Sequence, residues 1–165
     1  MKEKLKHYAK EIISFIIIIT ILSNLISIYK SSDLSKEKLS NTNLELVSGY
    51  KFELDNSKPI LIHFWASWCP TCKLEAQNIQ TISENFQVLS IAIKSGSDYD
   101  IVEYLAENEL NFYVHNDEQG LLSSKFNVVA YPTTFIYDKD GNLKFSEVGY
   151  TSTFGLWTRM LWSEL

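Results

Sequence analysis

The apolar residues of the chain follow two different periods over its central part. Residues 59–66 (PILIHFWA) and 88–93 (VLSIAI) are near-continuous apolar runs, which are typical of strands buried on both faces of a sheet. Between these runs, apolar residues recur at three- to five-residue intervals, at Leu74, Ile79, Ile82 and Phe86. That spacing places them on one face of a helix, so a strand–helix–strand unit is predicted.

The rest of this part continues the alternation of helices and strands. The pattern predicts a helix over 98–110, a strand over 111–117, a short helix over 118–126, a hairpin over 133–149 and a last helix capped by Ser152. Asp140-Gly141 lies between the two arms of the hairpin and is a strong turn signal. Alternation over residues 44–54 around Ser48-Gly49 predicts a further small hairpin or two short strands. Together these elements predict an α/β fold with a mixed central sheet flanked by helices.

The amino-terminal part has a different pattern. Ile12 to Tyr29 is an uncharged, Ile- and Leu-rich run of 18 residues, which spans about 27 Å as a helix. Four lysines precede it, at Lys2, Lys4, Lys6 and Lys10. A basic flank favours leaving the amino terminus in the cytoplasm, so we expect a transmembrane signal anchor. A cleavable signal peptide is the alternative, but the run is long and no clear small-x-small cleavage site follows it.

The polar stretch over residues 30–43 is interpreted as a linker. The expected organisation is a cytoplasmic amino terminus at 1–11, the anchor at 12–29, the linker at 30–43 and a globular domain at 44–165. Residues 1–40 carry a net charge of +3 and residues 41–165 a net charge of -8. This acidic domain argues against nucleic-acid binding. Arg159 is the only arginine among 15 basic residues, and it is a candidate for a planar ion pair that lysine cannot form.

The only two cysteines of the chain form the motif W-C-P-T-C at 68–72, where the buried strand meets the following helix. A thiol at a helix amino terminus faces unpaired N–H groups, which favour the thiolate and lower its pKa, so Cys69 is predicted to be a nucleophile. Pro70 suits the first helical turn. Cys72 lies one turn further and can close a disulfide with Cys69, which predicts thiol–disulfide exchange with Cys72 as the resolving thiol.

Other uses of two cysteines are less well supported by the sequence. A zinc site normally needs four ligands, and the domain offers only His63 and His115 besides the cysteines. Covalent haem requires a histidine after the second cysteine, where Lys73 stands. A purely structural disulfide would close a loop too short to constrain the unfolded chain much. A Cu(I)-binding module that uses the same pair of thiolates is the alternative function, although no Met-rich tract accompanies it.

These motifs carry a family resemblance. FWASWCPTC after a buried strand, with AYPTTFIYDKDGNL some 60 residues later, resembles the thioredoxin superfamily. It is most similar to the membrane-anchored thiol–disulfide oxidoreductases related to TlpA, ResA and DsbE, and the ending GYTSTFGLWTRMLW looks closest to the suppressor-of-copper-sensitivity D type. The resemblance covers about residues 44–165. It implies a thioredoxin fold, protein dithiols or disulfides as partners and no cofactor or metal.

The resemblance also implies roles for individual residues. The residues that it places along the substrate cleft are Trp68, Pro70, Thr71, Tyr131 and Pro132. Pro132 would be cis and stand opposite Cys69, although the family more often has a smaller residue than Tyr131 before it. His63 stands where thioredoxin carries a buried acid, and Glu75 matches a position of ResA-like proteins. Either could take a proton from Cys72. The implied location is the bacterial inner (cytoplasmic) membrane, in a single pass, with the catalytic domain in the periplasm or otherwise outside the cytoplasm. The implied partners include a membrane redox partner.

Overall fold

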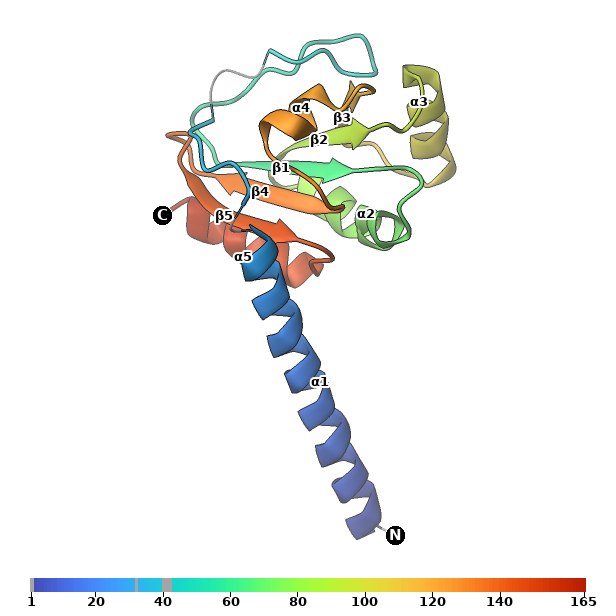
Figure 1. The fold of residues 1–165 in the computed structure, drawn as a ribbon, viewed down its shortest axis with the longest axis vertical. Coiled ribbons are helices and arrows are strands. Elements are labelled where there is room, and N and C mark those ends of the chain that lie inside the picture. The colour runs from blue at the N-terminus through green and yellow to red at the C-terminus, as the bar shows by residue number, and fades with distance from the viewer. Residues whose placement is uncertain (1, 32, 40–42) are drawn as a thin grey trace.

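A five-stranded sheet forms the centre of the molecule (Figure 1). The structure is a computed structural model that describes residues 2–31, 33–39 and 43–165. The elements in chain order are α1 (Lys2–Ser31), β1 (Ile60–Trp65), α2 (Pro70–Ser83), β2 (Gln87–Ile93), α3 (Asp98–Glu107), β3 (Tyr113–Asp117), α4 (Leu121–Lys125), β4 (Thr133–Tyr137), β5 (Leu143–Val148) and α5 (Thr153–Ser163).

The sheet is mixed, as the sequence predicts. Its strand order is β3-β2-β1-β4-β5. The strands β1, β2 and β3 pair in parallel, whereas β4 pairs antiparallel with both β1 and β5. The helix α3 ends at Glu107, short of the predicted residue 110, because Asn108 leaves helical geometry and Glu109 has a φ of 55°. The predicted α/β fold with a mixed central sheet flanked by helices is therefore confirmed.

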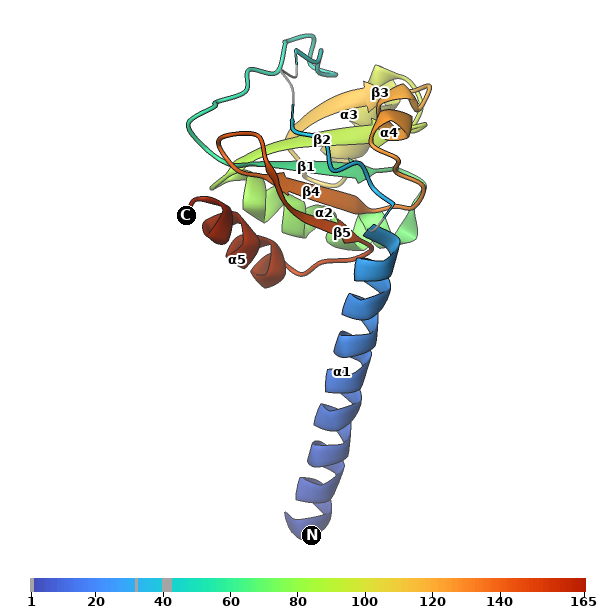
Figure 2. The ribbon, with the colours of Figure 1, turned by 60° about the vertical axis from the view of Figure 1, so that its left-hand side comes forward.

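The two faces of the sheet are covered by different parts of the chain. Alternate residues of β1 divide between two hydrophobic clusters, one with Leu61 and Trp65 and the other with Ile60, Ile62 and Phe64. Residues of α2, α3 and α5 complete the first cluster, while residues of α4 and of the segment before β1 complete the second. Figure 2 shows α2 and α5 on the opposite side of the sheet from α4. All six residues of β1 are buried, as its continuous apolar pattern predicts.

The segment before β1 packs against the domain. Residues 44–54 form a small turn with one antiparallel bridge, Glu45 to Lys51, and Gly49 adopts a φ of 80° in that turn. Leu34 is only 5% exposed, and the backbone N–H of Ser35 donates to the carbonyl of Phe126 over 3.1 Å. The described part of the segment 30–43 is thus held against the sheet. Part of that stretch, at 32 and 40–42, lies outside the described residues.

The helix α1 projects away from the sheet, with the amino terminus at its far end (Figures 1 and 2). Its last turns contact the free edge of β5. The Ser27 hydroxyl donates to Glu147 Oε2 over 3.1 Å and accepts the backbone N–H of Val148 over 3.0 Å. Over the part of the chain that the structure describes, no helix is both long enough and apolar enough to cross a membrane.

Candidate active site

Cys69 is the N-cap residue of α2, four residues after Trp65, the last residue of β1. Its backbone is extended, with φ -86° and ψ 115°, and Pro70 occupies the first turn of the helix. The backbone N–H of Cys72 donates to Cys69 Sγ over 3.3 Å. This is the contact that a capping side chain makes with an otherwise unpaired N–H group, and it directs the positive end of the amide dipole at the sulfur. The two cysteines are free thiols that lie close together.

Cys72 lies beneath Cys69 and is only 2% exposed. Burial raises the pKa of its thiol well above the ordinary value, and the hydrogen bond with Cys69 and the charges of Cys69 and Glu75 raise it further. A buried thiol of this kind is a poor nucleophile until a base removes its proton. The chemistry of the pair therefore needs a proton acceptor near Cys72.

Glu75 is the buried acid of the site. Its side chain is fully buried, Oε1 accepts the backbone N–H of Thr151 over 3.0 Å, and Oε2 has no hydrogen-bond partner. Burial raises the pKa of Glu75 to about 8; the Thr151 N–H lowers it and the charge of Glu147 raises it. An unpaired buried oxygen is costly, so its presence beside a reactive thiol indicates a functional role. Glu75 is therefore a candidate proton acceptor for Cys72.

His63 lies within the sheet and is 2% exposed. Its Nδ1 is 2.9 Å from the Thr134 hydroxyl on the neighbouring strand β4. Burial lowers the pKa of His63 to about 3, so the imidazole is neutral over the physiological range. The charge of Glu75, in contrast, contributes to the raised pKa of Cys72. The structure thus gives the imidazole a hydrogen-bond partner that links β1 to β4.

The loop before β4 lies opposite Cys69. The Tyr131–Pro132 peptide bond is cis, and Pro132 is buried. The carbonyl oxygen of Tyr131 lies 3.7 Å from Cys69 Sγ. The backbone N–H of Gly149 donates to the Pro132 carbonyl over 2.8 Å, which ties this loop to the end of β5. The polypeptide backbone at Tyr131 is therefore adjacent to the reactive sulfur, where a bound peptide segment can pair with it.

Two aromatic residues, Trp68 and Tyr131, are neighbours of Cys69. Trp68 is 59% exposed, and its indole N–H donates to the carbonyl of Lys94 over 3.1 Å. Its ring packs edge-on against Tyr131, with centroids 5.9 Å apart and an interplanar angle of 81°. Cys69 is only 6% exposed beside this pair. Of the other predicted cleft residues, Pro70 is exposed and Thr71 is half-buried.

Replacing Tyr131 by threonine is expected to speed the reaction of Cys69 with protein disulfides. The change removes the ring contact with Trp68, which is worth about 1 kcal/mol and corresponds to a roughly fivefold change in rate. The measurement is the second-order rate constant of thiol exchange with a protein disulfide. It is compared with the rate constant of alkylation by iodoacetamide, a small reagent that needs less separation of the two rings to reach Cys69. Tyr131→Phe keeps the ring and is the matched control. Equal rates in wild type and Tyr131→Thr would show that the ring pair does not limit access.

Some members of the site carry no sequence signal. Thr151, which binds Glu75, and Lys94, which binds Trp68, contribute only backbone atoms, so residue type gives no indication of them.

The ion pair expected for Arg159 is present, with Glu147 as its partner at 2.8 Å. Across the described residues, no three or more His, Cys, Asp or Glu side chains cluster in a way that could hold a metal ion.

Comparison with known proteins agrees with this geometry. The AhpC/TSA family model matches residues 33–146. A thioredoxin-like protein of Haemophilus influenzae is 29% identical over 99% of this chain and 97% of its own length. The sporulation thiol-disulfide oxidoreductase A of Bacillus subtilis is 25% identical over 64% of this chain and 69% of its own length.

Solved structures show the same fold. A putative thiol:disulfide interchange protein DsbE from Chlorobium tepidum superimposes with a TM-score of 0.70 at 23% identity, over 80% of this chain and 99% of that protein. The region matched by the family model, residues 33–146, contains the strands β1 to β4, both cysteines and the cis-proline loop. The chain therefore belongs to the AhpC/TSA family of thioredoxin-like proteins, and it is a thioredoxin-like enzyme whose relatives are thiol–disulfide oxidoreductases of the TlpA, ResA, StoA and DsbE kind.

Proposed function

We propose that the chain is a membrane-tethered, extracytoplasmic thiol–disulfide oxidoreductase that exchanges disulfides with partner proteins through Cys69 and Cys72. The observation that carries the proposal is the position of Cys69 at the N-cap of α2, with its sulfur between the Cys72 N–H and the Tyr131 carbonyl. A partner segment that pairs with the backbone at Tyr131 would bring its disulfide to this sulfur.

The exchange takes two steps. The thiolate of Cys69 attacks one sulfur of the partner disulfide; a mixed disulfide forms and the other partner sulfur leaves with the electron pair and takes up a proton. Glu75 then accepts the proton of the Cys72 thiol, and the Cys72 thiolate attacks Cys69 Sγ. The Cys69–Cys72 disulfide forms and the partner is released with both sulfurs reduced. The pair has lost two electrons, and the reverse sequence oxidises a partner dithiol.

Disulfide exchange with insulin tests the catalytic part of the proposal. The full chain, supplied with dithiothreitol, is expected to accelerate the reduction of the insulin disulfides, followed as release of insulin thiols. Equilibration of the Cys69–Cys72 pair with glutathione, read by alkylation, gives its reduction potential and hence the favoured direction. A chain that accelerates no exchange in either direction would contradict the proposed function.

The membrane tether is proposed from the uncharged run between Ile12 and Tyr29 and the lysines before it. Because Ser27 contacts β5, the part of α1 that could enter the bilayer ends before that turn. Residues 12–26 span about 22 Å, which is less than the roughly 30 Å of a bilayer core, so the tether requires Lys10 to extend its stem to the interface and the bilayer to thin locally. The cleft would then be held close to the membrane surface, where it meets membrane-bound partners at high effective concentration.

Membrane fractionation tests the tether. The full chain is expected to remain with the membranes after a high-salt wash. The double variant Ile18→Lys, Leu22→Lys is expected in the soluble fraction, because each lysine near the helix centre costs about 3 kcal/mol of insertion free energy. Mass spectrometry of the wild-type protein distinguishes a retained anchor from a cleaved signal peptide. Wild-type protein in the soluble fraction would contradict the tether.

A further inference from the structure

An ion pair between Arg159 and Glu147 lies next to the loop between β5 and α5, whose backbone binds Glu75. Arg159 on α5 reaches to β5, where its Nη2 lies 2.8 Å from Glu147 Oε1. Its Nη1 donates at the same time to the carbonyl of Gly155 in its own helix over 2.9 Å. The two charged side chains are 24% and 17% exposed, so solvent screens the pair only partly. Lysine has no planar fork and cannot make both contacts in this geometry.

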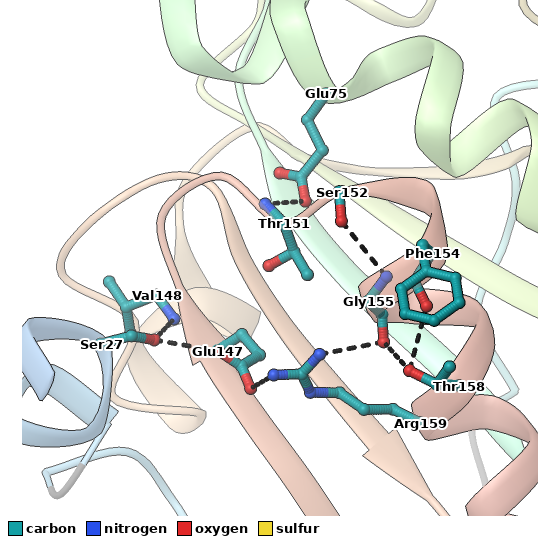
Figure 3. Close-up of polar contacts among 10 residues, drawn as sticks. All are labelled: Ser27, Glu75, Glu147, Val148, Thr151, Ser152, Phe154, Gly155, Thr158 and Arg159. Atoms are coloured by element: carbon teal, nitrogen blue, oxygen red, sulfur yellow. Dashed lines mark hydrogen bonds and ion pairs between the residues drawn. The ribbon is translucent and has the colours of Figure 1, made fainter. Parts of the chain in front are cut away.

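The loop between β5 and α5 connects this pair to the active site. Its residue Thr151 supplies the N–H group that binds Glu75. A Cβ atom built on Gly155 would lie 3.1 Å from Arg159 Nη1 and 3.1 Å from Thr151 Cγ2, so the guanidinium and Thr151 pack closely around that glycine. Figure 3 shows the Glu147–Arg159 pair and the contact between Glu75 and Thr151 at the two sides of this loop.

The charge of Glu147 acts on Glu75. It raises the pKa of Glu75, after burial as the larger cause, because two carboxylates repel each other across the low-dielectric interior. Arg159 pairs with Oε1 of Glu147, and the Ser27 hydroxyl of α1 donates to Oε2 of Glu147 over 3.1 Å. On the α2 side, the ionisable neighbours of Glu75 are Cys72 and, beyond it, Cys69.

Of the other ionisable groups near the cysteines, Tyr104 and His63 are neutral over the physiological range, whereas Lys73, whose Nζ lies 6.0 Å from the centroid of the Tyr104 ring, carries a positive charge. Tyr104 on α3 faces both thiols, and burial raises the pKa of its hydroxyl. His63 on β1 is uncharged because burial lowers the pKa of its imidazole to about 3. Glu147 is the charge from β5 that acts on the pKa of Glu75, and Arg159 is the counter-ion of Glu147.

We propose that Arg159 is a positioning residue for the resolving step: by pairing with Glu147 it limits the repulsion of Glu75 by that carboxylate, and so keeps Glu75 able to accept the proton of Cys72. The inference rests on the proposed function, in which Glu75 is the base for Cys72. Arg159 and Glu147 touch neither the partner disulfide nor the reacting sulfurs. They act through Glu75 alone.

The test follows the two steps of the reaction separately. The reduced full chain is mixed with an equal amount of dithio-bis-nitrobenzoate, an aromatic disulfide whose thiolate product is coloured. The first equivalent of product reports attack by Cys69, and the second reports attack by Cys72 on the resulting mixed disulfide. The rate of the second phase is measured against pH in each variant, and its midpoint reports the ionisation of Glu75.

Arg159→Met and Glu147→Gln break the same ion pair but are expected to shift the midpoint in opposite directions. Loss of Arg159 leaves Glu147 unpaired and raises the midpoint by roughly 0.5 pH unit, whereas loss of the Glu147 charge lowers it by a similar amount. The double variant Arg159→Met, Glu147→Gln is expected to have a midpoint at or below that of the wild type. The midpoint of Arg159→Lys is expected to lie between those of the wild type and Arg159→Met. The first-phase rate is expected to stay unchanged in all of them.

Lys144→Met is the matched control. Lys144 also lies on β5 and pairs with an acid, Asp138, at 3.4 Å, but at the other end of the strand. Its loss removes one positive charge from the same element and is expected to leave the midpoint unchanged. Shifts of the same sign in Arg159→Met and Glu147→Gln, or no shift in either, would overturn the inference. These are the outcomes expected if the ion pair only stabilises the structure, because both variants then lose the same contact.

Glu75→Gln separates this inference from the proposed function. If the second phase keeps its wild-type midpoint in Glu75→Gln, then Glu75 is not the base, and that part of the proposed function fails together with the inference. If Glu75→Gln abolishes the midpoint while Arg159→Met and Glu147→Gln leave it in place, only the inference fails. The expected result is a midpoint that disappears in Glu75→Gln and shifts in opposite directions in the two other variants.

Discussion

Cys69→Ser is expected to abolish disulfide exchange, whereas Cys72→Ser is expected to stop it halfway. The hydroxyl of serine is a far weaker nucleophile than a thiolate, so no mixed disulfide forms without Cys69. Without Cys72 the first step still occurs, and the partner remains attached to Cys69 because the attack that releases it is lost. The measurements are insulin reduction and non-reducing electrophoresis of the protein after reaction with a partner disulfide.

The two single variants control for each other, because each removes one sulfur from the same pair. A covalent adduct that accumulates in Cys72→Ser and is absent in Cys69→Ser would identify Cys69 as the attacking thiol. The opposite distribution would reverse the assignment. Unchanged insulin reduction in Cys69→Ser, together with tight retention of Cu(I) by the wild-type protein, would favour the copper-binding alternative over the enzyme.

The stability of the reduced protein is expected to be flat between pH 4.5 and 6.5 and to fall by about 2 kcal/mol from pH 6.5 to pH 8. Glu75 causes the fall. Its pKa is raised from 4.5 to about 8 on folding, so the folded state binds more protons than the unfolded state, and stability decreases as pH rises across that range.

His63 has the opposite effect at lower pH. Its pKa is lowered from 6.5 to about 3, so the unfolded state binds more protons and stability increases with pH up to 6.5. Between pH 4.5 and 6.5 the two slopes cancel. Glu75→Gln removes one of them, so this variant is expected to gain stability up to pH 6.5 and then to stay level.

Urea unfolding of the full chain, followed by tryptophan fluorescence at a series of pH values, measures both curves. Glu75→Gln keeps the shape of the side chain and serves as the comparison in which only the titration is lost. A wild-type protein whose stability stays constant from pH 6.5 to pH 8 would show that Glu75 is ionised in the folded state at neutral pH. In that case the pH dependence of the resolving step would also not be expected to follow a raised pKa of Glu75.

The main elements of the fold could be predicted from the sequence because each follows from a local pattern. Continuous apolar runs in β1 and β2 and the helical spacing after Cys69 depend only on which positions are buried. The turn at Asp140-Gly141 follows from backbone preference, and Gly141 has a φ of 77° in the structure. The junction of β1 and α2, with the two cysteines on it, is likewise a local feature.

Contacts between distant segments could not be predicted in this way. The approach of Thr151 to Glu75 joins residues 76 positions apart, and that of Ser27 to Val148 joins residues 121 positions apart, both through backbone N–H groups that every residue other than proline carries. The burial of Cys69 and the contact between the Trp68 and Tyr131 rings also depend on how two separate loops meet.

Residue type and spacing are enough to predict one cysteine pair at a strand–helix junction of an α/β domain. The surroundings of the two candidate proton acceptors, in contrast, depend on the tertiary structure. His63 and Glu75 are equal candidates by position, but folding buries both and gives the imidazole a hydroxyl partner on β4, while one carboxylate oxygen of Glu75 has none. The proton affinity of each group is set by burial and by charges on other elements, and these exist only once the chain has folded.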